Sequence, residues 1–127
     1  MIATLHSGEF LDYEGNIIRV TFKTDVDFVV SIDTITCGGS GGVYEVTAYV
    51  THSKYTIGHR ITSYDWSKIE LIDKYINSDN HNVYKYKITV NAVPEGAVLF
   101  NPRIGFAIFE TDIEGKTYQK TIKITQQ

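Results

Sequence analysis

The stretch that decides the fold lies at the carboxyl end: Asn101-Pro-Arg-Ile-Gly-Phe-Ala-Ile-Phe-Glu110, then Thr111-Asp-Ile-Glu-Gly115, then Lys116-Thr-Tyr-Gln-Lys-Thr-Ile-Lys-Ile-Thr-Gln-Gln127. Apolar residues alternate with polar ones along both arms, at Tyr118, Ile122 and Ile124 in the last arm and at Ile104, Phe106 and Ile108 in the first. A period of two is that of a strand with one buried face. Gly115 can supply the positive φ that a tight turn requires. The stretch therefore predicts a β-hairpin.

The amino-terminal third contains a second hairpin signal and a strong chain interruption. Glu14-Gly15-Asn16 separates Phe10-Leu11-Asp12 from a run in which Ile18, Val20 and Phe22 alternate with polar residues. The apolar run Phe28-Val29-Val30-Ser31-Ile32 predicts a strand buried on both faces. Gly38-Gly39-Ser40-Gly41-Gly42 has no apolar side chain to anchor it, so it predicts a loop or a flexible connector.

The middle of the chain alternates with the same period. Residues 43–51 and 83–91 each read as strands, and the turn-forming residues 77–82 lie just before the second run. Around Trp66, the apolar residues also fit one helical face. We prefer a turn that leads into a short strand, because the turn cluster follows so closely. Short strands between frequent turns predict an all-β antiparallel sandwich.

Composition argues against several classes of function. The formal net charge is -3 and the charges are interspersed, so the chain lacks the basic run that nucleic-acid binding requires. No stretch approaches the roughly 20 apolar residues that span a bilayer. Cys37 is the only cysteine, so we expect a small buried hydrophobe and no intrachain disulfide. The chain therefore predicts one domain that binds neither nucleic acid nor membrane.

The sequence contains no pattern that predicts catalysis or a cofactor. The four histidines, at positions 6, 52, 59 and 81, have no metal-ligand spacing to cysteines or carboxylates, although His52 and His59 could approach each other across a short connection. Ser40 lies among glycines but lacks both the nucleophile-elbow and the phosphate-loop contexts. We therefore expect a protein that is not an enzyme and that has no catalytic residues, no metal site and no cofactor.

Surface aromatic residues are the remaining candidates for function. Nine tyrosines exceed what one core of this size accommodates comfortably, because a buried phenol needs a hydrogen-bond partner. Exposed tyrosines and tryptophans stack on sugar rings and anchor protein interfaces. The candidate contact residues for a glycan or a protein partner are Tyr49, Tyr55, Tyr64 and Trp66. For Trp66 we prefer the alternative, that it plugs the core of the sandwich.

Several motifs of the chain resemble the BACON domain, an immunoglobulin-like β-sandwich of gut Bacteroidetes and of phages that infect them, including crAss-like phages. The matching motifs are Cys37-Gly-Gly-Ser-Gly-Gly-Val-Tyr-Glu-Val46, Tyr55-Thr-Ile57, Asp65-Trp66-x-x-Ile69, Lys87-Ile-Thr-Val-Asn91, Arg103-x-Gly-Phe-Ala-Ile108, Tyr118 and Thr121-Ile-Lys-Ile-Thr-Gln126. The resemblance implies an immunoglobulin-like sandwich over residues 32–127, preceded by a β-hairpin extension over residues 1–31. That extension is similar to the opening hairpin of some phage structural proteins.

The resemblance implies two alternative functions. BACON domains have been proposed to bind carbohydrate or mucin, usually within exported proteins, and they share no binding residues that can be carried over. This amino terminus has neither the basic start nor the apolar segment of a secretory signal. We therefore expect an auxiliary or decoration protein of a Bacteroidetes phage virion, assembled in the host cytoplasm, whose partners are the major capsid protein or other virion proteins. The alternative is a glycan-binding module located outside the cell or on its surface.

Overall fold

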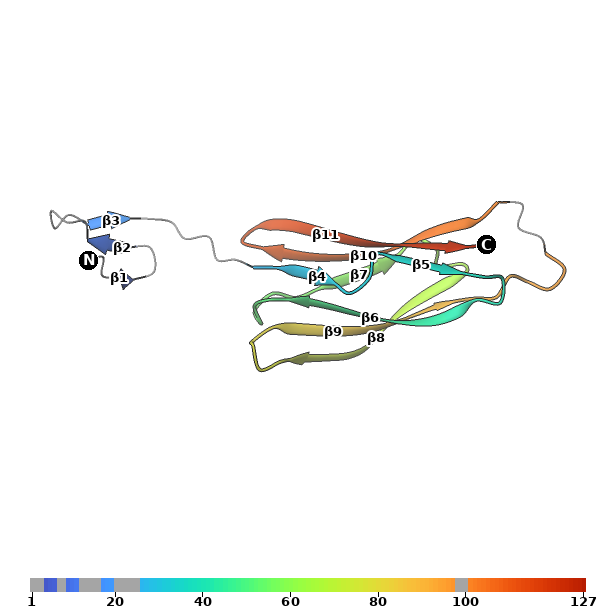
Figure 1. Ribbon diagram of the computed structural model, residues 1–127, viewed down its shortest axis with the longest axis horizontal. Coiled ribbons are helices and arrows are strands. Elements are labelled where there is room, and N and C mark those ends of the chain that lie inside the picture. Colours follow the sequence, from blue (N-terminus) through green and yellow to red (C-terminus); the bar gives the residue numbers. More distant parts are fainter. Residues whose placement is uncertain (1–3, 7–8, 12–16, 20–25, 98–100) are drawn as a thin grey trace.

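The structure is a computed structural model that describes residues 4–6, 9–11, 17–19, 26–97 and 101–127 (Figure 1). Every regular element in these ranges is a β-strand. The strands are β1 Thr4–His6, β2 Glu9–Leu11, β3 Ile17–Arg19, β4 Phe28–Val30, β5 Thr34–Cys37, β6 Gly42–Val50, β7 Gly58–Ile61, β8 Ser67–Ile76, β9 Asn82–Val90, β10 Arg103–Ile113 and β11 Lys116–Gln126.

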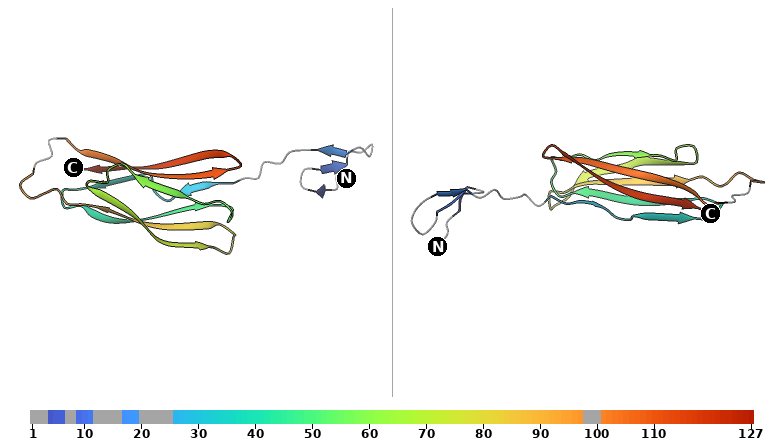
Figure 2. Two further views of the ribbon diagram at one scale, coloured as in Figure 1. Left: turned by 180° about the vertical axis from the view of Figure 1, so that it is seen from behind. Right: turned by 90° about the horizontal axis from the view of Figure 1, so that it is seen from above.

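Two four-stranded sheets pack face to face as a sandwich, with strand orders β4-β6-β9-β8 and β5-β11-β10-β7 (Figures 1 and 2). If β4 and β5 are taken as the two halves of a first strand A, then β6 to β11 follow as strands B to G. The sheets become ABED and A′GFC, which is the strand order of immunoglobulin domains. The prediction of an all-β, immunoglobulin-like sandwich is therefore confirmed. One detail differs from an all-antiparallel arrangement, because β5 pairs parallel to β11.

The core lies between the sheets and is built from alternate residues of the long central strands. On β9, Tyr84, Tyr86, Ile88 and Val90 are buried, and Val46, Ala48 and Val50 face them from β6. From the other sheet, Ala107 and Phe109 of β10 and Ile122 and Ile124 of β11 complete this core. Phe109 and Tyr86 meet edge to face, with ring centroids 5.0 Å apart. The period-two predictions for residues 43–51 and 83–91 are thus confirmed.

The carboxyl-terminal hairpin forms as predicted, and its two central turn residues are Glu114 and Gly115. Both have positive φ, at 51° and 81°, which is the conformation of a type I′ turn. On β11 the predicted apolar positions Ile122 and Ile124 are fully buried, whereas Tyr118 is exposed because it lies near the hairpin tip.

The apolar alternation of β10 describes the outer face of the sheet. Ala107 pairs with Ile122 and shares its core side, so Ile104 and Phe106 point outward and are 50% and 40% exposed. Gly105 explains why this side of β10 faces the core. It leaves room on the core side for Ser63 and Trp66, which would collide with any larger side chain.

Three further segments correct or refine the sequence predictions. Strand β4 is only partly buried, since Phe28 is in the core and Val29 and Val30 are half-buried. It pairs with β6, so the sandwich includes residues on the amino-terminal side of the boundary expected at residue 32. The segment 38–42 is a hydrogen-bonded turn, in which Gly41 has φ of 74° and its N–H donates to the carbonyl of Gly38 at 3.1 Å. Residues 64–66 form a turn, and the ten-residue strand β8 begins directly after Trp66.

A separate antiparallel sheet, β1-β2-β3, precedes the sandwich and pairs with none of its strands. The pairing of β2 with β3 confirms the backbone of the predicted amino-terminal hairpin. Strand β1 is an addition that the sequence did not indicate. The expected turn at residues 14–16 and the alternating residues beyond Arg19 lie outside the described residues.

Candidate binding surfaces

Trp66 is part of a structural network at the end of the sandwich that holds the carboxyl terminus. Its ring is 8% exposed and is covered by the guanidinium of Arg103, which lies 4.6 Å from the ring centroid. Arg103 Nε donates to Gln126 Oε1 at 2.7 Å. Gln126 Nε2 in turn donates to the carbonyls of Asn91 and Gly38, at 2.8 and 3.1 Å. The structure thus places Trp66 in the core, as the preferred alternative predicted.

Tyr64 stands two residues before Trp66 and is 81% exposed, so its ring is free on the surface. The tight turn behind it explains this placement. The N–H groups of Trp66 and Ser67 both donate to the carbonyl of Ser63, at 3.1 and 2.8 Å, which directs the intervening side chain outward.

Tyr49 and Tyr55 lie at the other end of the sandwich. The carbonyl of Tyr55 accepts a hydrogen bond from Asn82 Nδ2 at 2.7 Å, at the start of β9. Tyr49 pairs with Val83 in the same region, and its ring stacks on that of His81 with centroids 5.4 Å apart. Trp66, by contrast, accepts from Asn91 at the far end of β9. At about 3.3 Å per residue along β9, Tyr49 and Tyr55 are roughly 25 Å from Tyr64 and Trp66. The four aromatic residues therefore form no common platform.

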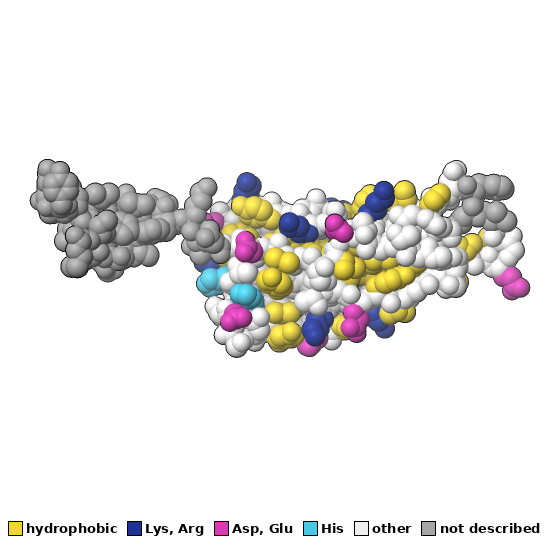
Figure 3. Space-filling view, in the orientation of Figure 1, with side chains coloured by type: hydrophobic (Ala, Val, Ile, Leu, Met, Phe, Trp, Pro, Cys, Tyr) yellow, Lys and Arg dark blue, Asp and Glu magenta, His cyan; other side chains and the backbone are white. Residues whose placement is uncertain are grey.

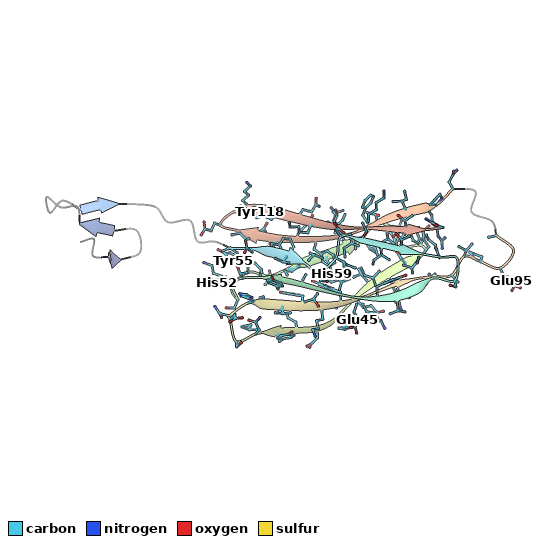
Figure 4. All side chains as sticks on the ribbon, viewed as in Figure 1. Glu45, His52, Tyr55, His59, Glu95 and Tyr118 are labelled. Carbon is cyan, nitrogen blue, oxygen red and sulfur yellow. The ribbon has the colours of Figure 1, made fainter. Side chains whose placement is uncertain are left out.

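A polar groove adjoins Tyr55. Tyr55 lies at the end of the sandwich where β4 begins (Figure 4). The groove has a volume of about 360 Å³ and is lined by Lys54, Tyr55, Thr56, Gly58, Glu110, Thr111, Asp112 and Thr117. Tyr55 itself is buried, with Lys54 Nζ 5.0 Å from its ring centroid, so the groove offers ammonium and carboxylate groups more than an open aromatic face. The volume lies in the range of small-ligand pockets, about 300–1,000 Å³.

The polar groups of this groove hold one another in place. Glu110 Oε1 accepts hydrogen bonds from Gln119 Nε2 at 3.0 Å and from Arg60 Nη2 at 3.5 Å. Thr117 Oγ1 donates to Asp112 Oδ1 at 2.5 Å, and Thr111 Oγ1 donates to the carbonyl of Thr56 at 2.8 Å. The sequence analysis identified none of these residues except Tyr55. Side chains alternate along β10, which predicts that Glu110 and Asp112 share a face. No sequence pattern near them indicates that the loop containing Tyr55 completes the groove.

His52, His59, His81 and Cys37 have structural contacts. The His52 ring lies against Tyr55 and the His59 ring against Tyr86, with centroids 5.8 and 5.1 Å apart. Within the described part of the chain, no three histidine, cysteine or acidic side chains are grouped to hold a metal ion. Cys37 is buried, and burial raises the pKa of its thiol. Cys37 therefore has the environment of a packed hydrophobe, as expected, rather than that of a reactive thiolate.

Besides Val43, Tyr64 and Tyr118, exposed apolar side chains form two groups on the sandwich. Ile104 and Phe106 lie on the outer face of β10, and Leu71, Ile72, Tyr75 and Ile76 lie along β8. Figure 3 shows hydrophobic side chains between charged ones on the face that it presents. In the ranges that the structure covers, there is no helix of the length and apolarity that a membrane crossing needs.

No protein-family model matches this chain, and no curated protein matches it. The fold therefore stands on the strand order itself, and the resemblance to BACON domains stays a prediction.

Proposed function

We propose that this chain is a non-enzymatic structural protein of a Bacteroidetes phage virion, acting as an auxiliary or decoration protein that binds the major capsid protein or another virion protein. The observation that carries the proposal is the exposed apolar pair Ile104 and Phe106 on the outer face of the sheet β5-β11-β10-β7. Large apolar side chains on an otherwise polar sheet face expose apolar area to water, which is unfavourable unless a partner protein covers them.

Two other features support an assembly role. An immunoglobulin-like sandwich presents two broad sheet faces and no deep apolar cavity, which suits attachment to another protein surface. The sheet β1-β2-β3 precedes the sandwich as a second element with its own edges, and short isolated sheets gain stability when another protein covers them. The amino-terminal resemblance to phage structural proteins agrees with a contact through this sheet.

The test is association with virus particles. We expect the protein to co-sediment with purified particles of the phage that encodes it, and its gene to lie among genes for particle assembly. Substituting Phe106→Ser together with Ile104→Ser should weaken co-sedimentation at least about tenfold while leaving the thermal unfolding transition in place. The matched control is Val43→Ser, which changes an exposed valine on the other sheet. Absence of the protein from purified particles would contradict the proposal.

The polar groove beside Tyr55 favours a second candidate, a carbohydrate-binding module. Mixed hydroxyl, ammonium and carboxylate groups match the donors and acceptors of a sugar. The test is a glycan array with the native protein, the groove variants Asp112→Asn and Thr117→Val, and Tyr64→Ala. Binding that is lost with the groove variants and retained with Tyr64→Ala would place a glycan in the groove. Array binding by none of the proteins, together with co-sedimentation, would favour the virion role.

A further inference from the structure

The two sheets leave one side of the sandwich incompletely closed. Strand β7 has four residues and ends its sheet, whereas β8 has ten and ends the other sheet on the same side. In the strand order described above, β7 takes the place of strand C and β8 that of strand D. Variable-type immunoglobulin domains add a strand C′ beside strand C at this position. The described part of this chain has no strand there.

Core-facing side chains of β8 are consequently uncovered. Leu71 pairs with Tyr86 and Ile76 pairs with Asn82, so both point to the same side as fully or nearly fully buried residues of β9. Leu71 is nevertheless 43% exposed and Ile76 is 59% exposed. Opposite them, His59 of β7 pairs with the buried Phe109, and its ring touches that of Tyr86. Leu71 and His59 therefore form the two rims of the opening between the edge strands, and Tyr86 is fully buried beneath it.

The backbone of β7 can accept another strand along this opening. The N–H of Thr62 donates to the carbonyl of Phe106, which fixes the alternation of the antiparallel ladder. By that alternation Arg60 bonds to β10, and the N–H and C=O groups of His59 and Ile61 point to the free edge. Two residues with outward backbone groups suffice to start the pairing of an extended segment.

The charge of the opening indicates what kind of segment would fit. The core-facing positions of β7 and β8 carry the imidazole of His59 and the ammonium of Lys74, and none of them carries a carboxylate. Lys74 Nζ lies 5.1 Å from the ring centroid of Tyr84, on the core side of β8. The opening thus offers apolar contact area and positive charge.

We propose that the free edge of β7 binds an extended segment of a partner protein as an added strand in the C′ position. The segment carries apolar side chains at alternate positions, which cover Leu71 and Ile76, and a carboxylate among them that faces Lys74. Backbone pairing to His59 and Ile61 supplies affinity, and the apolar and acidic positions supply specificity. This surface is distinct from the outer face of β10 and from the polar groove.

The experiment uses the full chain and two short synthetic peptides. In the first, valine alternates with threonine and the central valine is replaced by glutamate; in the second, lysine takes the place of that glutamate. We expect the acidic peptide to shift the backbone amide NMR signals of His59, Ile61 and Leu71, and the basic peptide to bind at least about tenfold more weakly because like charges meet at Lys74. Lys74→Glu should reverse this preference, whereas Lys123→Glu, on the outer face of β11, should preserve it.

A second pair of variants separates the backbone contact from the side chain. His59→Pro removes the free-edge N–H together with the imidazole, and His59→Ala removes the imidazole alone. We expect His59→Pro to abolish binding of the acidic peptide and His59→Ala to retain it. No shifts with the acidic peptide, shifts confined to another sheet edge, or equal affinity for both peptides would overturn the proposal. Dimerisation of the chain alone that Leu71→Glu abolishes would also overturn it, since a second copy would then occupy the edge.

Discussion

Gly105 is a residue at which the sandwich has no room for a side chain. A Cβ built at this position would overlap the side chain of Ser63 and lie 3.2 Å from Trp66 Cζ2. Ser63 cannot retreat, because its hydroxyl is 2.6 Å from that of Ser67 inside the turn. We therefore predict that Gly105→Ala lowers the free energy of unfolding by about 1–3 kcal/mol, the usual cost of overpacking. Urea denaturation followed by tryptophan fluorescence measures the change directly at Trp66.

Gly38→Ala is the matched control for this prediction. An added Cβ at Gly38 meets no atom within 4 Å, and the residue has no positive φ. Its free energy of unfolding should stay within about 0.5 kcal/mol of the native value. Equal effects of the two substitutions would show that the contact with Ser63 and Trp66 does not limit the packing.

The buried Tyr86 makes the free energy of unfolding depend on pH. Burial raises the pKa of its phenol above the value of about 10 found in unfolded chains. Below about pH 10 the phenol is neutral in both the folded and the unfolded chain, so its contribution to stability is fully present. As the pH rises, the unfolded chain ionises first, and stability is lost. Tyr86→Phe should remove this contribution, so its free energy of unfolding at pH 11 should fall about 1 kcal/mol less, relative to pH 7, than that of the native chain. Urea titrations at the two pH values test this, and equal falls would contradict it.

Among the structural elements, the β10–β11 hairpin offers a test of turn chemistry. Glu114 has φ of 51°, a conformation that asparagine tolerates better than glutamate, and Gly115 already suits the second turn position. Glu114→Asn should therefore raise the free energy of unfolding by about 0.5 kcal/mol. Glu95→Asn, at an exposed turn position without positive φ, removes the same charge and serves as control. Thermal unfolding of the two variants side by side measures the difference, and no gain for Glu114→Asn would refute the argument.

The same hairpin shows what periodicity predicts and what it leaves open. On β11 only one parity is apolar, so the buried positions Ile122 and Ile124 follow directly from the sequence. On β10 both parities are apolar, and the larger set lies on the outer face, where Ile104 and Phe106 are exposed and Ile108 is buried. The smaller set fits inside because Trp66 and Ser63, nearly 40 residues away in the chain, occupy the space beside Gly105. Only the tertiary packing contains that information.

The candidate surfaces also differ in whether they depend on local sequence or on tertiary packing. Tyr64 was predicted from composition and is exposed, because its position depends on a local turn. The groove beside Tyr55 depends on Glu110 and Asp112, which β10 brings to a loop more than 50 residues earlier in the chain. The opening beside β7 depends on unequal lengths of two edge strands. Neither surface has a local signature that a single sequence reveals.

At the scale of the whole molecule, the strand order makes the sandwich complete from β4 onward. Strand β4 supplies Phe28 to the core and pairs with β6, while the sheet β1-β2-β3 makes no strand pair with either layer. A sandwich that contains its own core and both central strand pairs should not need an appended sheet to fold. We therefore expect the sandwich to be stable without the amino-terminal sheet, and we propose that this sheet serves in attachment.

Deletion of residues 1–25 tests this separation. The shortened chain should keep its free energy of unfolding within about 0.5 kcal/mol of the native value, because it retains every core residue that the structure describes. Its co-sedimentation with particles should nevertheless weaken, since the proposed contact through β1-β2-β3 is lost. Urea denaturation gives the first quantity and sedimentation of mixed samples the second. A large loss of stability would show that the amino-terminal segment packs on the sandwich, and unchanged sedimentation would assign the contact to the outer face of β10 alone.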